Sequence, residues 1–169
     1  DALVAADMLR LPVLSFSVPE DGMKAWGGGR LRLHFGAWSY FHSLPVASNQ
    51  QFINAYQSRF GADQVVTDPA VASYVGVNLW AQTVREVGTA DPRWTNSSSL
   101  LRQSFAGPEG VVAVDARTRH LWKRLRIGRV LADGQFNQFF TSNELMRPAP
   151  WPVYRSHAEW QALLERERP

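Results

Sequence analysis

The chain has 169 residues, of which 45% are hydrophobic, 20% charged and 12% aromatic. These proportions are typical of a folded domain and exclude intrinsic disorder as the main state. The net charge is only +3, and no apolar run approaches the roughly 20 residues that span a bilayer, so neither a polycation nor a transmembrane protein is indicated. The absence of cysteine excludes disulfides, thiolate metal ligands and a thiol nucleophile.

The N-terminal part alternates between short apolar runs and turns. A helix is expected over residues 2–9, followed by strands over 13–18 and 31–36. The glycines at 27–29 predict a turn, because they lack the spacing of a nucleotide-binding loop. Ligand sites of parallel α/β sheets lie beyond the carboxyl ends of the strands, which places residues 17–22 at such an edge.

The middle of the sequence has helical periodicity. Ser48 or Asn49 is expected to cap a helix that ends at Gly61, and a shorter helix is expected over 97–105, beginning at one of the first two serines. The strongest helix is expected over 68–87, opened by an acidic N-cap and a proline. Its apolar spacing defines the face that we expect in the core: Ala72, Val75, Gly76, Leu79, Trp80, Thr83, Val84 and Val87.

The C-terminal part has the pattern of strands. Strands are expected over 110–115, 121–131 and 135–140, with the last two joined by a hairpin turn at Asp133-Gly134. After an extended proline-containing segment, Ser156 is expected to cap a tail helix.

A basic stretch runs through the second of these strands and has the composition of a surface that follows phosphates. Its cations are Arg117, Arg119, Lys123, Arg124, Arg126 and Arg129. Strand alternation, however, places its apolar residues on one face and its polar residues on the other, which favours a solvated strand face over nucleic-acid binding. The residues expected on the solvated face are His120, Trp122, Arg124 and Arg126.

No catalytic signature is present. There is no Gly-x-Ser-x-Gly or His-Glu-x-x-His motif, and the four histidines are scattered, so we expect neither catalytic residues nor a metal site. Glu109 and Asp115 form a possible carboxylate pair, but a turn acid and a strand-end acid describe them better.

A binding site is suggested at the ends of the first two strands. Ser15, Ser17 and Glu20 lie at the end of the first strand, and Trp38, Tyr40 and Phe41 follow the second. Hydroxyl and carboxylate acceptors with aromatic walls suit a small polar ligand that carries N–H groups. The alternative is that the aromatic residues belong to the core and that Glu20 is a helix-capping acid.

A family resemblance covers roughly residues 5–152 and is carried by the order and spacing of nine motifs. They are Pro12–Glu20, Gly36–Phe41, Ser48–Tyr56, Asp68–Gly76, Leu79–Trp80, Ala106–Gly110, Arg119–Lys123, Arg126–Gly128 and Asp133–Phe136. Together they resemble the type I periplasmic ligand-binding receptors of branched-chain amino acid, urea and short-chain amide ABC transporters. The urea-binding members are the nearest in pattern.

The resemblance implies an α/β fold of two lobes joined by three crossovers, of which this chain holds parts of both lobes and lacks the N-terminal half. Residues 1–36 would belong to the second lobe, and 37–106 to a crossover and the helices of the first. Residues 107–147 would return to the second lobe and include an antiparallel hairpin, and 148–169 would form an extended segment and a tail helix. Because few parallel strands remain, a large apolar helix face would be exposed.

The resemblance also implies a function. The chain would be a fragment of a substrate-binding protein that captures urea, a short-chain amide or an amino acid by hinged closure, without a cofactor and without catalysis. Glu20 would accept N–H bonds, Ser15 or Ser17 would add a hydroxyl, and Trp38 and Tyr40 would wall the site.

The partner would be an ABC permease, the only link to the membrane, and the location would be periplasmic, with any signal peptide outside this chain. The alternatives are an amide- or urea-responsive sensor with the same fold and, less favoured, a nucleic-acid-binding module.

Overall fold

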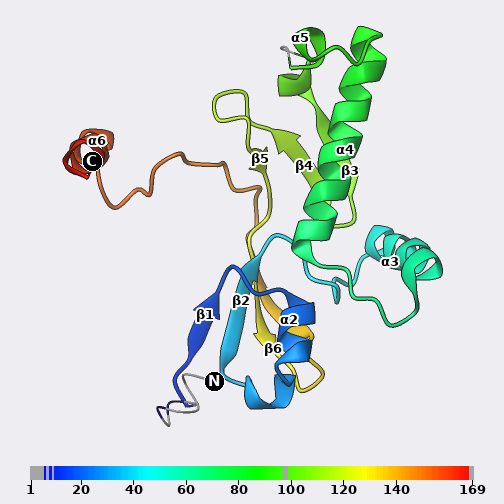
Figure 1. The fold of residues 1–169 in the computed structure, drawn as a ribbon, viewed down its shortest axis with the longest axis vertical. Coiled ribbons are helices and arrows are strands. Elements are labelled where there is room, and N and C mark those ends of the chain that lie inside the picture. Colours follow the sequence, from blue (N-terminus) through cyan, green and yellow to red (C-terminus); the bar gives the residue numbers. More distant parts are fainter. Residues whose placement is uncertain (1–5, 7, 9, 97–98, 168–169) are drawn as a thin grey trace.

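The computed structural model of the chain describes residues 6, 8, 10–96 and 99–167. Figure 1 shows a four-stranded sheet at one end, and a long helix packed on a three-stranded sheet at the other. A C-terminal segment leads away from both and ends in a helix. The helix expected over residues 2–9 falls largely outside the described residues. No described helix has both the length and the apolar character needed to cross a bilayer.

The four-stranded sheet has the order β1-β2-β6-β7. Its parallel pair is β1 (Val13–Ser15) and β2 (His34–Trp38), and β6 (Arg126–Val130) and β7 (Phe136–Thr141) continue it antiparallel. The hairpin predicted between β6 and β7 is confirmed. β1 is shorter than expected because the Ser15 hydroxyl accepts the backbone N–H of Val18 at 3.3 Å, which turns the chain.

One face of this sheet is covered by α2 (Glu20–Ala25), which follows β1. The core here contains Met23, Phe41, Val130 and Phe136, each with at most 2% of its surface exposed. The Phe41 and Phe136 rings lie 4.8 Å apart between centroids. Glycine is required beneath them, since a Cβ on Gly36 would lie 2.7 Å from the Phe136 ring.

The three-stranded sheet pairs β3 (Ser104–Gly107), β4 (Gly110–Val114) and β5 (Leu121–Trp122), all antiparallel. The helix expected over 97–105 is therefore wrong in its described part, where a 3₁₀ turn at Leu100–Arg102 leads into β3. The tight turn between β3 and β4 explains the error, because it pairs these residues with β4 instead. The expected start of that helix, Ser97 or Ser98, lies outside the described residues.

The strand expected over 121–131 is two strands in two different sheets. Lys123 forms a bridge with Met146 between them, and the chain then passes to the four-stranded sheet, which it enters only at Arg126. We expected residues 107–147 to return to the lobe that holds residues 1–36. Instead, β4 and β5 lie in a different sheet from β1 and β2. The predicted solvated face is also wrong at Arg126, which is 7% exposed because it faces the junction of the two sheets.

The two main helices are α3 (Ala47–Phe60) and α4 (Asp68–Val87), and α4 has the predicted bounds. Its buried residues are Val71, Val75, Leu79 and Thr83. Trp80, which we expected in the core, is 48% exposed, and Tyr74 and Val77 are exposed as well. The three-stranded sheet covers only one side of α4, so the expected exposed apolar helix face is present.

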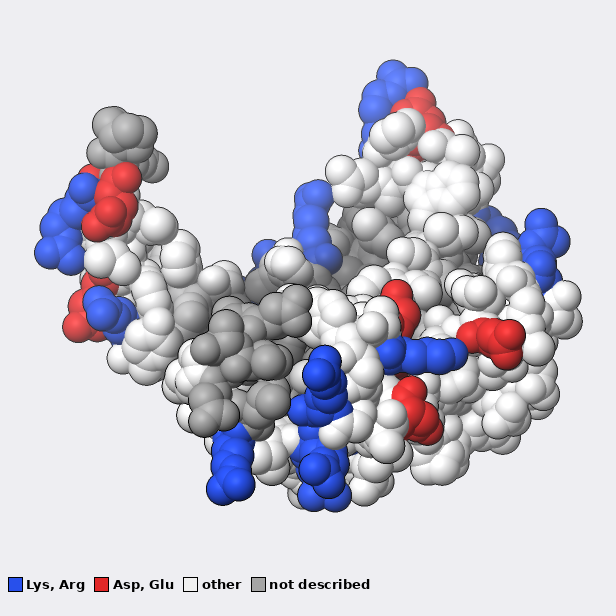
Figure 2. All heavy atoms as spheres, turned by 60° about the horizontal axis from the view of Figure 1, so that its bottom comes forward, with Lys and Arg blue, Asp and Glu red and all other residues white. Residues whose placement is uncertain are grey.

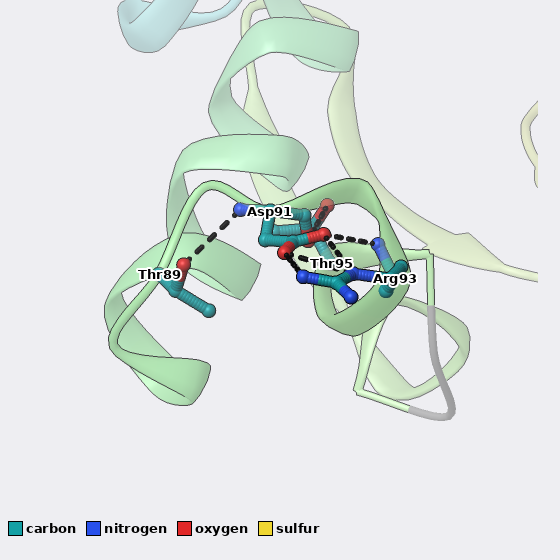
Figure 3. Close-up of polar contacts among 4 residues, drawn as sticks. All are labelled: Thr89, Asp91, Arg93 and Thr95. Carbon is teal, nitrogen blue, oxygen red and sulfur yellow. Dashed lines mark hydrogen bonds and ion pairs between the residues drawn. The ribbon is translucent and has the colours of Figure 1, made fainter.

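A short helix, α5 (Pro92–Thr95), follows α4 and is held by local polar contacts (Figure 3). The Asp91 carboxylate accepts the backbone N–H of Arg93 at 2.9 Å and also pairs with its guanidinium. Thr89 accepts the Asp91 N–H, and the Thr95 hydroxyl donates to the Asp91 carbonyl. These contacts fix the turn that leads the chain back from the end of α4.

The tail helix α6 (His157–Arg166) begins as predicted. Ser156 and Glu159 form a capping box, in which each side chain bonds the backbone N–H of the other residue. The Trp160 indole donates to the Pro152 carbonyl at 2.9 Å, and its ring lies against Trp151 and Tyr154. The tail therefore folds on itself.

The fit of Phe136 over Gly36 gives the first prediction. Gly36→Ala is expected to lower the free energy of unfolding by about 1–3 kcal/mol, because the added methyl group overpacks the core. Gly29→Ala is the matched control, since a Cβ there meets no atom within 4 Å. Urea denaturation of both variants measures the difference, and an equal effect of the two substitutions would contradict this account of the packing.

Candidate functional site

The buried polar side chains gather where the chain crosses between the two sheets. One crossover follows β2 and leads through residues 39–46 to α3, and another joins β5 to β6 through residues 123–125. Arg126 lies at the start of β6, where it pairs with Trp38 across the sheet. Its guanidinium donates to the Ser39 carbonyl and, at 2.8 Å, to the Glu109 carbonyl. One side chain thus connects β6, the first crossover and the β3–β4 turn.

Two carboxyl groups accompany Arg126. The Asp68 carboxylate accepts the backbone N–H of Ser39 at 3.1 Å, and Glu109 Oε2 lies 3.2 Å from the Lys123 ammonium. Burial raises the pKa of both carboxyl groups, whereas the positive charge of Lys123 lowers it. Asp68 was expected to cap α4, but it is the first residue of the helix, and its side chain binds the crossover instead.

A third buried carboxyl group, Glu20, begins α2 and is 1% exposed. Its Oε1 accepts the backbone N–H of His42 at 2.9 Å. Burial raises the pKa of Glu20 from 4.5 to about 7, against the hydrogen bond from His42, and Asp68 adds repulsion. His42 Nδ1 in turn accepts the Val66 N–H at 3.1 Å, and burial lowers the His42 pKa, so this ring is neutral near pH 7.

Tyr40 and Asn49 fix the crossover onto α3. The Tyr40 hydroxyl donates to the Asn49 side chain at 2.7 Å, and the Asn49 amide donates to the carbonyls of His42 and Leu44. The predicted capping role of Ser48 or Asn49 is wrong, because α3 begins at Ala47 and no side chain caps it. Asn49 bonds the loop carbonyls instead, since it faces inward and is 1% exposed.

The five residues expected to bind a ligand lie in different environments. Burial and, after it, the nearby Glu20 charge raise the Tyr40 pKa, but both residues are fully buried and bonded to protein. Tyr40 thus occupies the core, in line with the alternative left open by the sequence. The Ser15 hydroxyl accepts backbone N–H groups of its own turn, whereas Ser17 is exposed and Trp38 is half-buried.

Two buried polar atoms beside Arg126 lack a hydrogen-bond partner among the described residues. They are Trp38 Nε1, a donor, and Glu109 Oε1, an acceptor; Arg126 Nε is a further donor without a partner, and Glu109 Oε2 has only the ion pair with Lys123. Leaving such groups unsatisfied costs about 1–3 kcal/mol each, so a partner for them would stabilise the site. From the sequence, Glu109 was expected only as a turn acid, without a role in binding. Arg126 was expected on the solvated face of a strand. The signal that could have indicated both is their place in motifs that carry the family resemblance.

Glu109 and Asp115 do not form a carboxylate pair. Glu109 lies in the turn between β3 and β4, and Asp115 follows the end of β4, as the favoured interpretation predicted. Asp115 accepts the backbone N–H groups of Arg117 and Thr118 and the indole N–H of Trp122. Its role is to hold the turn between β4 and β5. Among the described residues there is no cluster of three metal-ligating side chains.

Residues 4–157 match the family model described as a periplasmic binding protein domain. The chain belongs to this family. The fold is shared with a solute-binding protein of an ABC transporter from Rhodopseudomonas palustris, solved with 3,4-dihydroxybenzoic acid. That match has a TM-score of 0.72 at 21% identity and covers 86% of this chain and 41% of that one. The type I periplasmic-binding-protein-like α/β fold expected from the sequence is therefore confirmed.

Two further proteins are similar to the chain. An amino acid ABC transporter substrate-binding protein from Pseudomonas fluorescens matches with a TM-score of 0.69 at 18% identity, over 87% of this chain and 40% of that one. A protein named limonene hydroxylase from Geobacillus stearothermophilus is 27% identical over 117 residues, which are 69% of this chain and 21% of that protein. The chain thus spans well under half the length of the relatives that it matches.

The contacts of Arg126 give the second prediction. Arg126→Met should lower the free energy of unfolding by about 3 kcal/mol, because one buried and one partly buried carbonyl group lose their donor and Glu109 loses a nearby cation. Arg117→Met, at an exposed position, removes the same charge and is the control. Guanidinium denaturation compares the two, and a difference below about 0.5 kcal/mol would contradict a structural role for the buried guanidinium.

The buried Glu20 gives a prediction about pH. Its folded-state pKa of about 7 lies above the ordinary 4.5, so the folded protein holds a proton that the unfolded chain releases between these values. The contribution of Glu20 to stability is therefore fully present below pH 4.5 and is lost as the pH rises through 7, by at most about 3 kcal/mol.

Glu20→Gln tests this because the glutamine carbonyl can still accept the His42 N–H without ionising. The variant should be more stable than the parent at pH 8 and should lose part of the decline in stability between pH 5 and 8. Asp21→Asn, at the exposed neighbouring position, should keep that decline. Urea denaturation at pH 5, 6, 7 and 8 measures the profile, and identical profiles for parent and Glu20→Gln would refute the assignment.

Proposed function

We propose that this chain supplies part of the ligand-binding cleft of a substrate-binding protein of an ABC transporter. The observation that carries the proposal is a pair of buried atoms without a hydrogen-bond partner, Trp38 Nε1 and Glu109 Oε1, on two residues that each adjoin Arg126. One is a donor and the other an acceptor, and both lie where the two sheets meet. A small ligand with both an acceptor and a donor would satisfy them together.

Urea or a short-chain amide is the ligand class that we propose. Each carries a carbonyl oxygen for the Trp38 N–H and an N–H for the Glu109 carboxylate. The order of the sequence motifs supports the same class. The similar solved structures include one that holds 3,4-dihydroxybenzoic acid and one named as an amino acid binder, so these ligands are the competitors to test.

The remaining predicted residues take two roles in this proposal. Ser17 is exposed at the end of β1, and its hydroxyl is available to a ligand. Glu20 and Tyr40 hold the crossover through His42 and Asn49 and act on the ligand only by positioning that crossover. The Ser15 hydroxyl likewise holds the turn that presents Ser17.

Capture would be non-covalent and would proceed by hinged closure of two lobes about the crossovers. The closed form would be recognised by a membrane permease on the periplasmic side. The exposed face of α4, with Tyr74, Val77 and Trp80, would be covered by the remainder of the first lobe. This is consistent with the share of the similar solved chains, about two fifths, that this chain covers.

The proposal is tested by calorimetric titration of the full-length protein that carries this sequence with urea, acetamide, leucine and 3,4-dihydroxybenzoate. Urea or acetamide should bind most tightly. Glu109→Gln should weaken that binding about 10-fold or more, because the ligand loses a charged acceptor. Trp38→Phe should weaken it by less, since it removes one neutral hydrogen bond and keeps the aromatic wall.

Glu144→Gln is the matched control, because Glu144 is exposed and, among the described residues, its carboxylate has no hydrogen bond or ion pair with the crossover. It should leave the affinity unchanged. Preferred binding of leucine or the benzoate would overturn the ligand class, and unchanged affinity in Glu109→Gln would overturn the site.

A further inference from the structure

A basic surface lies at the end of the four-stranded sheet that is far from the crossovers. β2 runs from His34 at this end to Trp38 at the crossover, and the antiparallel β6 returns to the same end. Arg30 and Arg32 precede β2, Arg10 precedes β1, and Arg129 lies near the end of β6. The topology of the sheet therefore brings together four arginines that are separate in the sequence, and all four are exposed.

These arginines line two hollows in the surface. One, of about 440 Å³, lies between the strand that contains Arg129 and the segment that contains Arg32 and Leu33. The other, of about 340 Å³, is lined by Arg10, Arg30 and again Arg32 and Leu33. Because two residues line both hollows, the two are adjacent, and we call them together the basic depression. Leu33 and Leu131 are apolar residues of its lining.

Among the described residues, the lining of this depression contains arginines and no acidic side chain. No carboxylate lines either hollow, and the ion pairs found in the described part of the chain involve other cations: Arg93, Arg102, Lys123 and Arg147. Figure 2, which brings this end of the molecule forward, shows several Lys or Arg side chains on the surface that faces the viewer. A whole-chain charge of only +3 makes this local excess distinctive.

We propose that this depression binds a phosphate-class oxyanion carrying two or more negative charges. Guanidinium groups present paired N–H donors that match two oxygens of a phosphoryl group, and several of them can surround one such group. Bringing the anion in also relieves the repulsion among the arginines. The site lies at the opposite end of the sheet from Arg126 and Glu109, so it is independent of the proposed ligand cleft.

The shared chemistry is a phosphoryl oxyanion, whether free or carried by a lipid headgroup, and two assays separate these sources. Inorganic pyrophosphate is titrated calorimetrically at low salt, and sedimentation is measured with phosphatidylglycerol vesicles against phosphatidylcholine vesicles. The full chain is compared with the double variant Arg32→Gln/Arg129→Gln. The control is Arg85→Gln/Arg117→Gln, which removes the same charge from exposed positions elsewhere. Thermal unfolding checks that both variants remain folded.

We expect saturable binding in one of the two assays. The site variant should weaken this binding about 10-fold, and the control should change it less than about twofold. Binding should also weaken as salt rises. Saturation by pyrophosphate identifies a free anion, and binding to the anionic vesicles alone identifies a lipid headgroup. Absence of binding in both assays, or equal weakening in the two variants, would overturn the proposal. Glu109→Gln should leave this binding unchanged, which separates its outcome from that of the cleft.

Discussion

The arrangement of this molecule depends on one buried guanidinium. Arg126 donates to two carbonyl groups, one on the crossover after β2 and one in the β3–β4 turn. These segments adjoin different sheets, so a single side chain fixes where the sheets meet. Arginine suits this position because its planar group presents several donors in different directions, whereas lysine offers a single point of charge.

Burying that charge has consequences for the residues around it. Asp68 and Glu109 bring negative charge to the junction, and Lys123 brings a second cation, while Glu20 lies beneath the same crossover. Burial raises the pKa of all three carboxyl groups, because water no longer stabilises their ionised forms. The protonation of the junction and the contacts of a ligand there are therefore linked, since a donor brought to a carboxylate favours its charged form.

Part of the apolar surface of the chain is not covered by other described residues, which fits its place in a two-lobed family. α4 buries one row of side chains on the three-stranded sheet and leaves Tyr74, Val77 and Trp80 exposed on another side. At the other end, β1 is an edge strand, and Phe16 just beyond it is 69% exposed. Exposed apolar area of this kind is unfavourable in an isolated body and is normally covered by further chain or a partner.

The sequence by itself determined the elements whose signals are local. Pro69 and Gly88 mark the ends of α4, Asp133-Gly134 sets the β6–β7 hairpin, and Ser156 with Glu159 starts α6. In each case the deciding hydrogen bonds or backbone angles involve residues within a few positions of one another, as at Gly88, where φ is +74°. The order of its motifs was also sufficient to indicate the family.

Only the tertiary structure decided which polar residues are buried and which apolar ones are not. Arg126 is buried because carbonyl groups from distant segments accept its hydrogen bonds there. Asn49, predicted to cap a helix, instead donates to the carbonyls of the crossover loop. Trp80 lies outside because no second layer covers α4, and β3 replaced a helix because β4 was available to pair with it. These outcomes depend on contacts between residues far apart in the chain, which a local pattern does not contain.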